Sequence, residues 1–195
     1  MQYIGSAVGV TVDLNVDHLG FQSATGGDAT GDVLSGFERA TGSSHGDVLI
    51  GDSNNNRLSG GAGADVLTGN AGKDVLNGGA GADVLLGGIG ADQFVFSGAL
   101  GIGNVDQIFD FDAAEGDSLR LANGSFSSLT IGALQASEFR ANLSGAAEAA
   151  ADRIIYNSAT GQLYFDADGL GGMAAIEFAR LHAIPTLDAT DFFVI

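Results

Sequence analysis

The sequence predicts an all-β fold in which short parallel strands stack as the rungs of a coil. A glycine recurs at every ninth position from Gly42 to Gly87 and divides residues 42–95 into six nine-residue units without an insertion. The eighth position of every unit is leucine or phenylalanine. A fixed period of this kind is the signature of a repeat protein whose units stack on their neighbours. Each unit is therefore predicted to be a glycine-rich loop followed by a three-residue strand with one core side chain.

The sixth position of the unit carries the polar chemistry. Its occupants are Asp47, Asn56, Asp65, Asp74, Asp83 and Asp92. Each loop reverses the chain, so two units make one rung and residues eighteen apart stack, with Asp47, Asp65 and Asp83 along one edge. Neighbouring strands lie about 4.8 Å apart. Two oxygens on opposite sides of a calcium ion, each bonded at about 2.3–2.6 Å, have the same separation. The spacing predicts Ca²⁺ between successive rungs.

Folding and calcium binding are expected to be one event. Two carboxylates at this separation repel by about 3 kcal/mol at an effective dielectric of about 20. Ordering a loop costs about 1–2 kcal/mol per residue, whereas one buried leucine per unit returns only about 1.5–3 kcal/mol. Loop carbonyls are expected to complete the calcium shell, and Mg²⁺ to substitute poorly. The candidate glycines are Gly60, Gly63, Gly69, Gly72, Gly78, Gly81, Gly87 and Gly90.

Glycines at the first, second and fourth positions are predicted to adopt positive φ, which lets six residues turn through a tight loop. Asn54 and Asn70 replace glycine at such positions, and asparagine tolerates the same conformation. His45 also replaces the fourth glycine, and Asn56 replaces the aspartate of the second unit. We expect any site that uses Asn56 to bind calcium more weakly.

The pattern resembles the RTX, or hemolysin-type, calcium-binding repeat, whose consensus is G-G-x-G-x-D-x-U-x with U apolar. The closest copies are Gly60–Thr68, Gly78–Leu86 and Gly87–Val95. The resemblance implies a right-handed parallel β-roll with calcium between successive rungs. The best ligand pairs would be Asp65 with Asp83 and Asp74 with Asp92, followed by Asp47 with Asp65 and then Asn56 with Asp74.

Composition limits the partners. The 195 residues include 24 acidic and seven basic ones, which gives a formal net charge of −17. This charge argues against nucleic acid or an anionic membrane and favours cations. The hydrophobic content of 45% is too high for a chain that is always disordered, so order is expected to depend on calcium. Without cysteine, a metal ion is the alternative to disulfides in a secreted protein.

Neither a leader nor a membrane span is recognisable. The first residues, MQYIGSAVGV, lack the basic and apolar regions of a classical signal peptide. No stretch approaches the roughly 18–20 apolar residues of a membrane span, so membrane insertion is not expected.

Residues 1–41 are predicted to be an irregular N-terminal continuation of the roll. Alternating apolar residues indicate one half-buried strand: Val8, Val10, Val12, Leu14 and Val16. Gly27–Ser35 is interpreted as a decayed nonapeptide with Asp32 at the ligand position, fifteen residues before Asp47. Because Met1 leads almost directly into a strand, we expect the chain to be the tail of a longer protein.

Residues 96–121 are predicted to close the roll. Apolar residues alternate in Val105–Phe111 and in Asp117–Leu121, which predicts two strands. The segment resembles the D-x-I-x-D-F…D-x-L-x-L stretch that closes the roll in RTX proteins, including the serralysin-like C-terminal domain. Asp106, Asp110 and Asp117 either bind a further ion or are solvated and capping carboxylates.

Residues 122–195 are predicted to be β-rich, with a short helical or irregular segment at 135–148. Strands are expected at 152–157 and within 161–169, joined by a Ser-Ala-Thr-Gly turn. Asp168-Gly169 is predicted to be a hairpin turn, with an isolated calcium contact at Asp166 and Asp168 as the alternative. An EF-hand is rejected because its twelfth position would be alanine instead of glutamate.

The closing segment, Asp191-Phe192-Phe193-Val194-Ile195, resembles the tail of type I secretion substrates. In that family the export signal is C-terminal and uncleaved. The resemblance implies recognition by the type I secretion machinery and delivery outside a Gram-negative bacterium, either secreted or at the cell surface.

Catalytic motifs have a structural explanation. Gly42–Gly46 (GSSHG) matches the G-x-S-x-G nucleophile elbow, but it lies in register inside a repeat loop, whereas the elbow joins a strand to a helix. His18, His45 and His182 are scattered and lack zinc-site spacing. The sequence thus predicts a non-enzymatic calcium-binding module. Two alternatives stay open: the non-catalytic C-terminal part of a secreted protease, lipase or polysaccharide-modifying enzyme, and part of a surface adhesin or S-layer protein.

Overall fold

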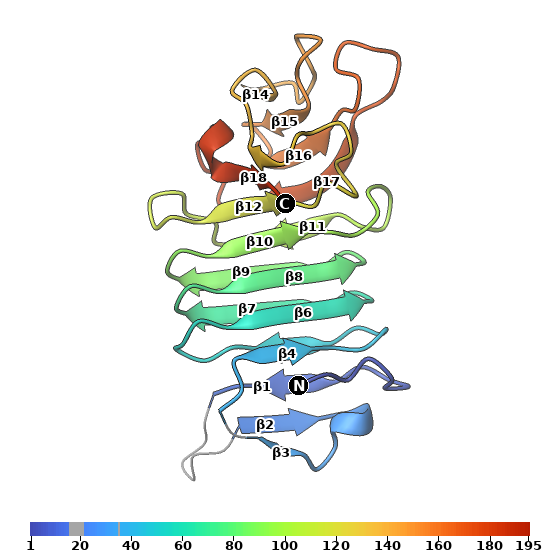
Figure 1. Ribbon diagram of the computed structural model, residues 1–195, viewed down its shortest axis with the longest axis vertical. Coiled ribbons are helices and arrows are strands. Elements are labelled where there is room, and N and C mark those ends of the chain that lie inside the picture. Colours follow the sequence, from blue (N-terminus) through green and yellow to red (C-terminus); the bar gives the residue numbers. More distant parts are fainter. Residues whose placement is uncertain (16–21, 35) are drawn as a thin grey trace.

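The computed structural model describes residues 1–15, 22–34 and 36–195. The strands of these residues form two sheets, one of seven strands and one of eleven, stacked along the long axis of the molecule (Figure 1). The middle of both sheets is parallel, so the predicted all-β parallel roll is confirmed. Val16 and His18 lie outside the described residues.

The nonapeptide units supply strands to the two sheets in turn. The strands are β5 (Val48–Ile50), β6 (Arg57–Ala62), β7 (Val66–Ala71), β8 (Val75–Ala80), β9 (Val84–Ile89) and β10 (Gln93–Phe96). Val48 pairs with Val66 and Val66 with Val84 in the larger sheet. Arg57 pairs with Val75 and Val75 with Gln93 in the smaller one. Each step is eighteen residues, which confirms the predicted register.

The core consists of two facing columns of side chains, one from each sheet. Each column contains one apolar residue per strand, because alternate residues of a strand face opposite sides. The eighth-position side chains are fully buried: Leu49, Leu58, Leu67, Leu76, Leu85 and Phe94. Burial of each contributes about 1.5–3 kcal/mol. The columns continue past the repeats through Ile108 and Leu181 in one sheet and Leu119 and Phe192 in the other.

The N-terminal end continues the parallel stack by one strand in each sheet. β4 (Arg39–Thr41) pairs with β6, and β1 (Thr11–Asp13) pairs with β5. Beyond β1, however, β2 (Gln22–Thr25) and β3 (Val33–Leu34) are antiparallel, with the short 3-10 helix η1 (Gly27–Ala29) between them. The interpretation of Gly27–Ser35 as a decayed nonapeptide is therefore wrong.

Asp32 has a local role in this end piece. Its Oδ2 atom accepts a hydrogen bond of 2.8 Å from the Tyr3 hydroxyl. The position beneath the Asp47 loop is taken by Gly9 and Val10 instead, since the Val10 amide donates to Asp47 Oδ1 at 2.6 Å. Because β2 and β3 form an antiparallel hairpin within one sheet, residues 27–34 do not supply strands to the two sheets in turn, and the period of the repeats does not extend through them.

The C-terminal region adds mixed β structure to both sheets. Its strands are β11 (Asp106–Ile108), β12 (Ser118–Leu121), β13 (Gly132–Ala133), β14 (Phe139–Asn142), β15 (Ile154–Asn157), β16 (Gln162–Phe165), β17 (Ile176–Leu181) and β18 (Phe192–Val194), with the 3-10 helix η2 (Ala189–Asp191) before β18. β11 and β12 continue the parallel stack as predicted. The predicted pair of strands around the Ser-Ala-Thr-Gly turn is the antiparallel hairpin β15–β16.

Two expectations about this region need correction. Within residues 135–148, expected to be helical or irregular, residues 139–142 form strand β14, parallel to β15; the centre of the Phe139 ring lies 5.2 Å from that of Phe192, a contact far apart in sequence. Asp168-Gly169 is not a tight hairpin turn, because a ten-residue connection, 166–175, joins β16 to β17. The Gly169 amide there donates to Asp166 Oδ1 at 2.9 Å.

Candidate metal centre in the nonapeptide loops

The loops of the repeats line the two edges where the chain passes between the sheets. Loops 42–47, 60–65 and 78–83 lead from the smaller sheet to the larger, and loops 51–56, 69–74 and 87–92 lead back. The sixth residue of every loop is buried, with at most 2% of its surface exposed. The sheets thus place two columns of buried polar side chains at opposite edges of the roll.

A hydrogen-bond ladder runs along each column. The Oδ1 atom of Asp65 accepts a bond of 2.8 Å from the backbone amide of Asp47, eighteen residues earlier. The same contact recurs, at 2.7–2.9 Å, from Asp65 to Asp83, from Asn56 to Asp74 and from Asp74 to Asp92. Each of these carboxylates therefore points toward the preceding rung, and one of its two oxygens is already satisfied.

The second oxygen is left without a partner in four consecutive units. The atoms are Oδ2 of Asp65, Asp74, Asp83 and Asp92, all buried. A buried carboxylate oxygen without a hydrogen bond is costly and needs an explanation, which an ion can supply. Oxygen is the ligand that Ca²⁺ prefers, so the donor set fits this ion.

The first glycine of each unit leaves room for a cluster of oxygens. A Cβ atom at Gly60 would lie 2.1 Å from Asp65 Oδ2 and 2.6 Å from the carbonyl oxygen of Gly78 in the next rung. A Cβ at Gly69 would meet Asp74 Oδ2 at 2.4 Å and the Gly87 carbonyl at 2.5 Å. The absent side chain thus lets a carboxylate oxygen and a backbone oxygen of successive rungs approach the same point.

The glycine positions differ in their backbone conformation, which corrects the sequence prediction. Positive φ occurs at the fourth position, for example 122° at Gly63, and at the second, for example 112° at Gly61. Asn70 has φ of 77°, as predicted, but Asn54 does not have positive φ. The first-position glycines do not have it either. They are required because a Cβ would occupy the space of the oxygens.

Electrostatics also favour a cation at these loops. Burial raises the pKa of Asp65 to about 7, and repulsion from Asp83 and Asp47 adds to this, against a hydrogen bond from the Asp47 amide that lowers it. Burial likewise raises the pKa of Asp74 to about 6 and shifts those of Asp83 and Asp92 upward. The charged form of each carboxyl is therefore destabilised unless a positive charge lies nearby.

Carboxylates alone do not form the site. In the part of the chain that the structure describes, no three His, Cys, Asp or Glu side chains converge as a metal cluster. A calcium ion held here would bind Asp oxygens together with backbone carbonyls such as that of Gly78, as expected from the sequence. The four partnerless oxygens and the glycine spaces fit such a mixed shell, which for calcium has about six to eight oxygens.

The closing segment extends both ladders by one rung. Asp106 Oδ1 accepts from the Asp83 amide at 3.2 Å, and Asp117 Oδ1 accepts from the Asp92 amide at 2.8 Å. Asp110 accepts from the Gly87 and Gly88 amides at 3.0 and 2.9 Å. Burial, together with the nearby Asp83, raises the pKa of Asp106 to about 8. The capping role of these carboxylates is thus visible, and a further ion at Asp106 stays a prediction.

Four polar residues at the loops were not singled out in the sequence. Ser43 and Asp52 donate their backbone amides to the sixth-position side chains of their own units. Glu38 accepts from the Asn56 side chain at 3.0 Å, and Glu115 accepts from the Gly90 amide at 3.0 Å. Glu38 lies eighteen residues before Asn56, so extending the period upstream would have found it. Ser43 and Asp52 occupy the second position of their units, but the period does not show that their amides bind a side chain, and Glu115 lies outside the repeats.

The remaining motifs are structural. The GSSHG loop lies between strands β4 and β5, so it lacks the strand-to-helix context of a nucleophile elbow; Ser44 Oγ and His45 Nδ1 are 3.4 Å apart and exposed. His182 is exposed and stacks on Phe109, with ring centres 4.1 Å apart. Asp166 and Asp168 lie in the connection between β16 and β17, where Asp166 Oδ1 accepts the Asp168 and Gly169 amides.

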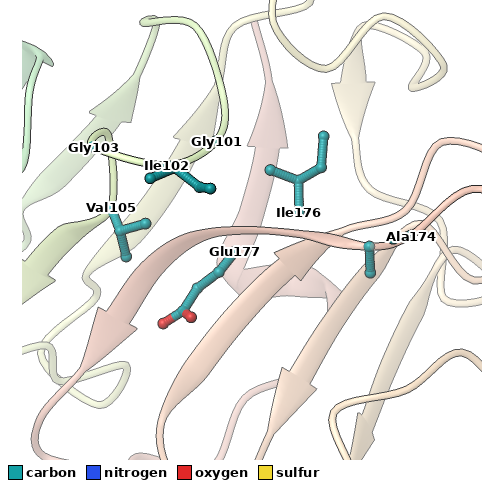
Figure 2. Close-up of a pocket in the computed structure, with 8 residues that line it drawn as sticks. Gly101, Ile102, Gly103, Val105, Ala174, Ile176 and Glu177 are labelled. Carbon is teal, nitrogen blue, oxygen red and sulfur yellow. The ribbon is translucent and has the colours of Figure 1, made fainter.

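A hollow of about 490 Å³ lies beside this connection, between residues 101–105 and the start of β17 (Figure 2). Its lining is mostly apolar, and Ile102, Val105 and Ile176 surround it. Glu177, the charged residue of the lining, is already paired with Arg180 and Gln162, each at 3.0 Å. The hollow therefore presents no free acid or base for chemistry. Among the described residues, no helix is long and apolar enough to cross a membrane.

Comparison with known proteins agrees with the loop geometry. The family model of the RTX calcium-binding nonapeptide repeat matches residues 41–76 and 59–94. No curated protein is significantly similar to the chain. The solution structure of the AlgE6R2 subunit from the Azotobacter vinelandii mannuronan C5-epimerase is 24% identical, with a TM-score of 0.50, over 80% of this chain and 91% of that chain.

A second subunit of the same enzyme, AlgE6R3, is 27% identical over 76% of this chain and 77% of that chain, with a TM-score of 0.49. The AlgE6R2 likeness concerns the fold alone, whereas the family match concerns the loops themselves. RTX nonapeptide repeats bind calcium, and the match covers the four loops with partnerless oxygens. The chain therefore carries an array of RTX calcium-binding nonapeptide repeats over residues 41–94.

Proposed function

We propose that this chain is a calcium-binding module that folds when it binds Ca²⁺ outside the cell. The observation that carries the proposal is the set of four buried carboxylate oxygens, on Asp65, Asp74, Asp83 and Asp92, that have no hydrogen-bond partner. When bound, the ion supplies positive charge at these oxygens. The side chains of these four Asp residues and the glycine carbonyls of successive loops hold it.

Coupling between folding and binding follows from the same contacts. Each open carboxylate is fully buried, next to a like charge eighteen residues away, and its pKa is raised. Leaving such groups unpaired opposes folding of the loops. An ion that binds only the folded loops stabilises them by mass action. Calcium at extracellular concentration would then favour the roll, and its scarcity in a bacterial cytosol would leave the repeats unfolded.

We further propose that the last residues carry an uncleaved type I secretion signal of a Gram-negative bacterium. In the folded chain, strand β18 is paired with β12, and the side chains of Phe192 and Val194 are at most 1% exposed. A secretion machine could reach these two side chains only before β18 pairs with β12. Calcium-dependent folding of the repeats supports the proposal, because without it β12 lacks its partner β10 and the end of the chain stays accessible during export.

The module itself is proposed to be non-catalytic. The GSSHG loop lacks the context of a nucleophile elbow, and Glu177 in the hollow is paired. The chain can equally serve as the calcium-binding part of a larger secreted enzyme or surface protein, and that role would leave the loops unchanged. Sequence upstream of Met1 distinguishes these settings.

Titration with calcium tests the central proposal. The circular dichroism spectrum of the metal-free protein should lack the β signal of the repeats and gain it at millimolar Ca²⁺, with little response to the same concentration of Mg²⁺. Isothermal titration calorimetry should show binding over the same range. A spectrum that is already fully β in the metal-free protein, with no heat of calcium binding, would refute the proposal.

A truncation tests export separately. Removal of residues 191–195 should abolish export from a host that contains a type I system, because the signal is lost. The truncated protein should still respond to calcium, since β12 separates β18 from β10, the last strand of the repeats (Figure 1). Unchanged export would contradict the secretion proposal and leave the calcium proposal standing.

A further inference from the structure

The six loops of the array are not equivalent. In the first two units, the sixth-position side chain is saturated with hydrogen bonds from the protein. Asp47 Oδ2 accepts from the Ser43 amide at 2.6 Å and from the Ser43 hydroxyl at 3.2 Å, while Oδ1 accepts from the Val10 amide at 2.6 Å and the same hydroxyl at 3.1 Å. Asp47 is 1% exposed, so these bonds replace water completely.

In the second unit the sixth-position side chain is also fully hydrogen-bonded, although it is an amide, Asn56, instead of a carboxylate. Asn56 Oδ1 accepts from the Asp52 amide at 2.7 Å. Its Nδ2 donates to Glu38 Oε2 at 3.0 Å and to Asp52 Oδ1 at 3.1 Å. Neither Asp47 nor Asn56 therefore has a buried oxygen that lacks a partner, in contrast to the following four units.

The residue at the second position of the unit accounts for this difference. Ser43 and Asp52 have negative φ, and their amides donate to the sixth-position side chain. The second residues of the other four units have positive φ: 112° at Gly61, 77° at Asn70, 105° at Gly79 and 96° at Gly88. In these units the backbone amide of the second residue does not donate to the carboxylate at the sixth position of the same unit.

Strand length shows the same division. β4 and β5 are three residues long and end before the loops that begin at Gly42 and Gly51. β6 to β9 are six residues long and continue through the first positions of the next unit. Gly61 pairs with Gly79 and Asn70 with Gly88 across these extensions. The second-position residue thus either pairs in the strand ladder or donates its amide to the sixth-position side chain.

We propose that the second residue of each unit decides whether its loop takes calcium, so that loops 60–65, 69–74, 78–83 and 87–92 are open to the ion while loops 42–47 and 51–56 are closed by the protein itself. This inference rests on the proposed calcium-binding function. The closed loops form a calcium-independent N-terminal end of the array, on which the open loops stack. Ser43 and Asp52 are positioning residues, because they act through Asp47 and Asn56.

Two isosteric variants test the division. Asp47→Asn should leave the number of bound calcium ions and their affinities unchanged, because Asn56 already occupies the same position in a closed loop. Asp65→Asn, on the same edge, should lose one ion or weaken its binding at least tenfold. The readouts are calorimetric stoichiometry and native mass spectrometry on the full chain. Loss of an ion in Asp47→Asn equal to that in Asp65→Asn would overturn the proposal.

A gain of calcium binding tests directly whether Ser43 closes loop 42–47. Ser43→Gly removes the hydroxyl and permits the positive φ seen at Gly61, so this variant should bind one more calcium ion than the wild type. Ser44→Gly is the matched control, since the Ser44 hydroxyl is exposed and contacts only the His45 ring among described residues. Equal ion counts in Ser43→Gly and Ser44→Gly would overturn the role of Ser43. A wild-type protein that binds no calcium would refute the proposed function instead.

Discussion

The repeat array and the C-terminal region both contain fully buried aspartates, but their surroundings shift the pKa values of these aspartates in opposite directions. Asp83 in the array and Asp152 in the C-terminal region are both 0% exposed. Asp152 accepts from Arg140 Nε at 3.1 Å and from the Glu148 and Ala149 amides at 2.8 Å each. Although burial alone would raise it, these donors hold the pKa of Asp152 below its usual value, whereas that of Asp83 is raised.

The hydrophobic core is also smaller per strand in the array than in the C-terminal region. The array has one apolar side chain per strand on each side of the roll. The C-terminal region has a cluster of aromatic rings, in which Phe126 lies 5.1 Å from Phe165 and 5.1 Å from Phe178, centre to centre. Such rings bury large apolar areas and so stabilise the C-terminal region without a bound ion. On the proposed function, the array needs a bound cation to offset its buried carboxylates, whereas the C-terminal region offsets Asp152 with its own hydrogen-bond donors.

Withdrawal of calcium should separate the two regions most strongly. Amides of β6 to β9 should lose protection from hydrogen exchange, because their loops lose the charge that neutralises the buried aspartates. Amides of the hairpin β15–β16 should lose much less. Hydrogen exchange followed by mass spectrometry, with and without chelator, measures both in one sample. Equal loss in the two regions would show that the chain is a single calcium-dependent unit.

A methyl group at the first glycine of a loop should have the next largest effect. Gly60→Ala places a Cβ 2.1 Å from Asp65 Oδ2. Overpacking of this kind costs about 1–3 kcal/mol in unfolding free energy, and we expect calcium affinity to fall at least tenfold. Gly124→Ala is the control, because a Cβ there meets nothing within 4 Å. Urea unfolding in calcium and calorimetry measure the two effects, and similar results for both variants would contradict the oxygen cluster.

The pH dependence of the metal-free protein should be the reverse of that of most proteins. The folded-state pKa values of about 7 for Asp65, 6 for Asp74 and 8 for Asp106 exceed the unfolded value of about 3.9. The native state therefore binds more protons, and its stability falls as pH rises from about 4 to about 8.

Circular dichroism of dialysed protein should accordingly show a larger folded fraction at pH 5 than at pH 8. With calcium present the order should invert, because the ion competes with protons for the same oxygens. A metal-free folded fraction that increases with pH would argue that these carboxylates are not buried unpaired.

Small effects are expected from removing either of two arginines of the C-terminal region, and Arg140→Ala should have the larger one. It removes the cation beside Asp152 but leaves the Glu148 and Ala149 amides in place, so the melting temperature should fall modestly. The fall should be the same with and without excess calcium above saturation, since Arg140 is remote from the loops. Arg180→Ala, which breaks a partly exposed pair with Glu177, should change stability less. A calcium-dependent response to Arg140→Ala would contradict the independence of the two regions.

Much of the roll could be predicted because its information is local and periodic. The eighteen-residue register, the core leucines and the alignment of Asp65 with Asp83 all follow from one period. The prediction failed where that period was absent or misread. Gly27–Ser35 has the composition of a repeat, but β2 and β3 pair antiparallel. Residues 139–142 became a strand because β15 offers a partner and Phe192 a packing surface.

By itself the sequence determined the repeat, the two edges and the residues that line them, because a nine-residue period admits one register for two sheets. Only the tertiary structure decided which carboxylates remain free. The amide of a second-position residue joins the strand ladder or binds the sixth-position side chain according to the backbone conformation that the residue adopts in the folded loop. In the folded chain, four oxygens on Asp65, Asp74, Asp83 and Asp92 remain without partners, whereas Asp47 is satisfied by Ser43 and Val10, and Asp152 by Arg140 and two backbone amides.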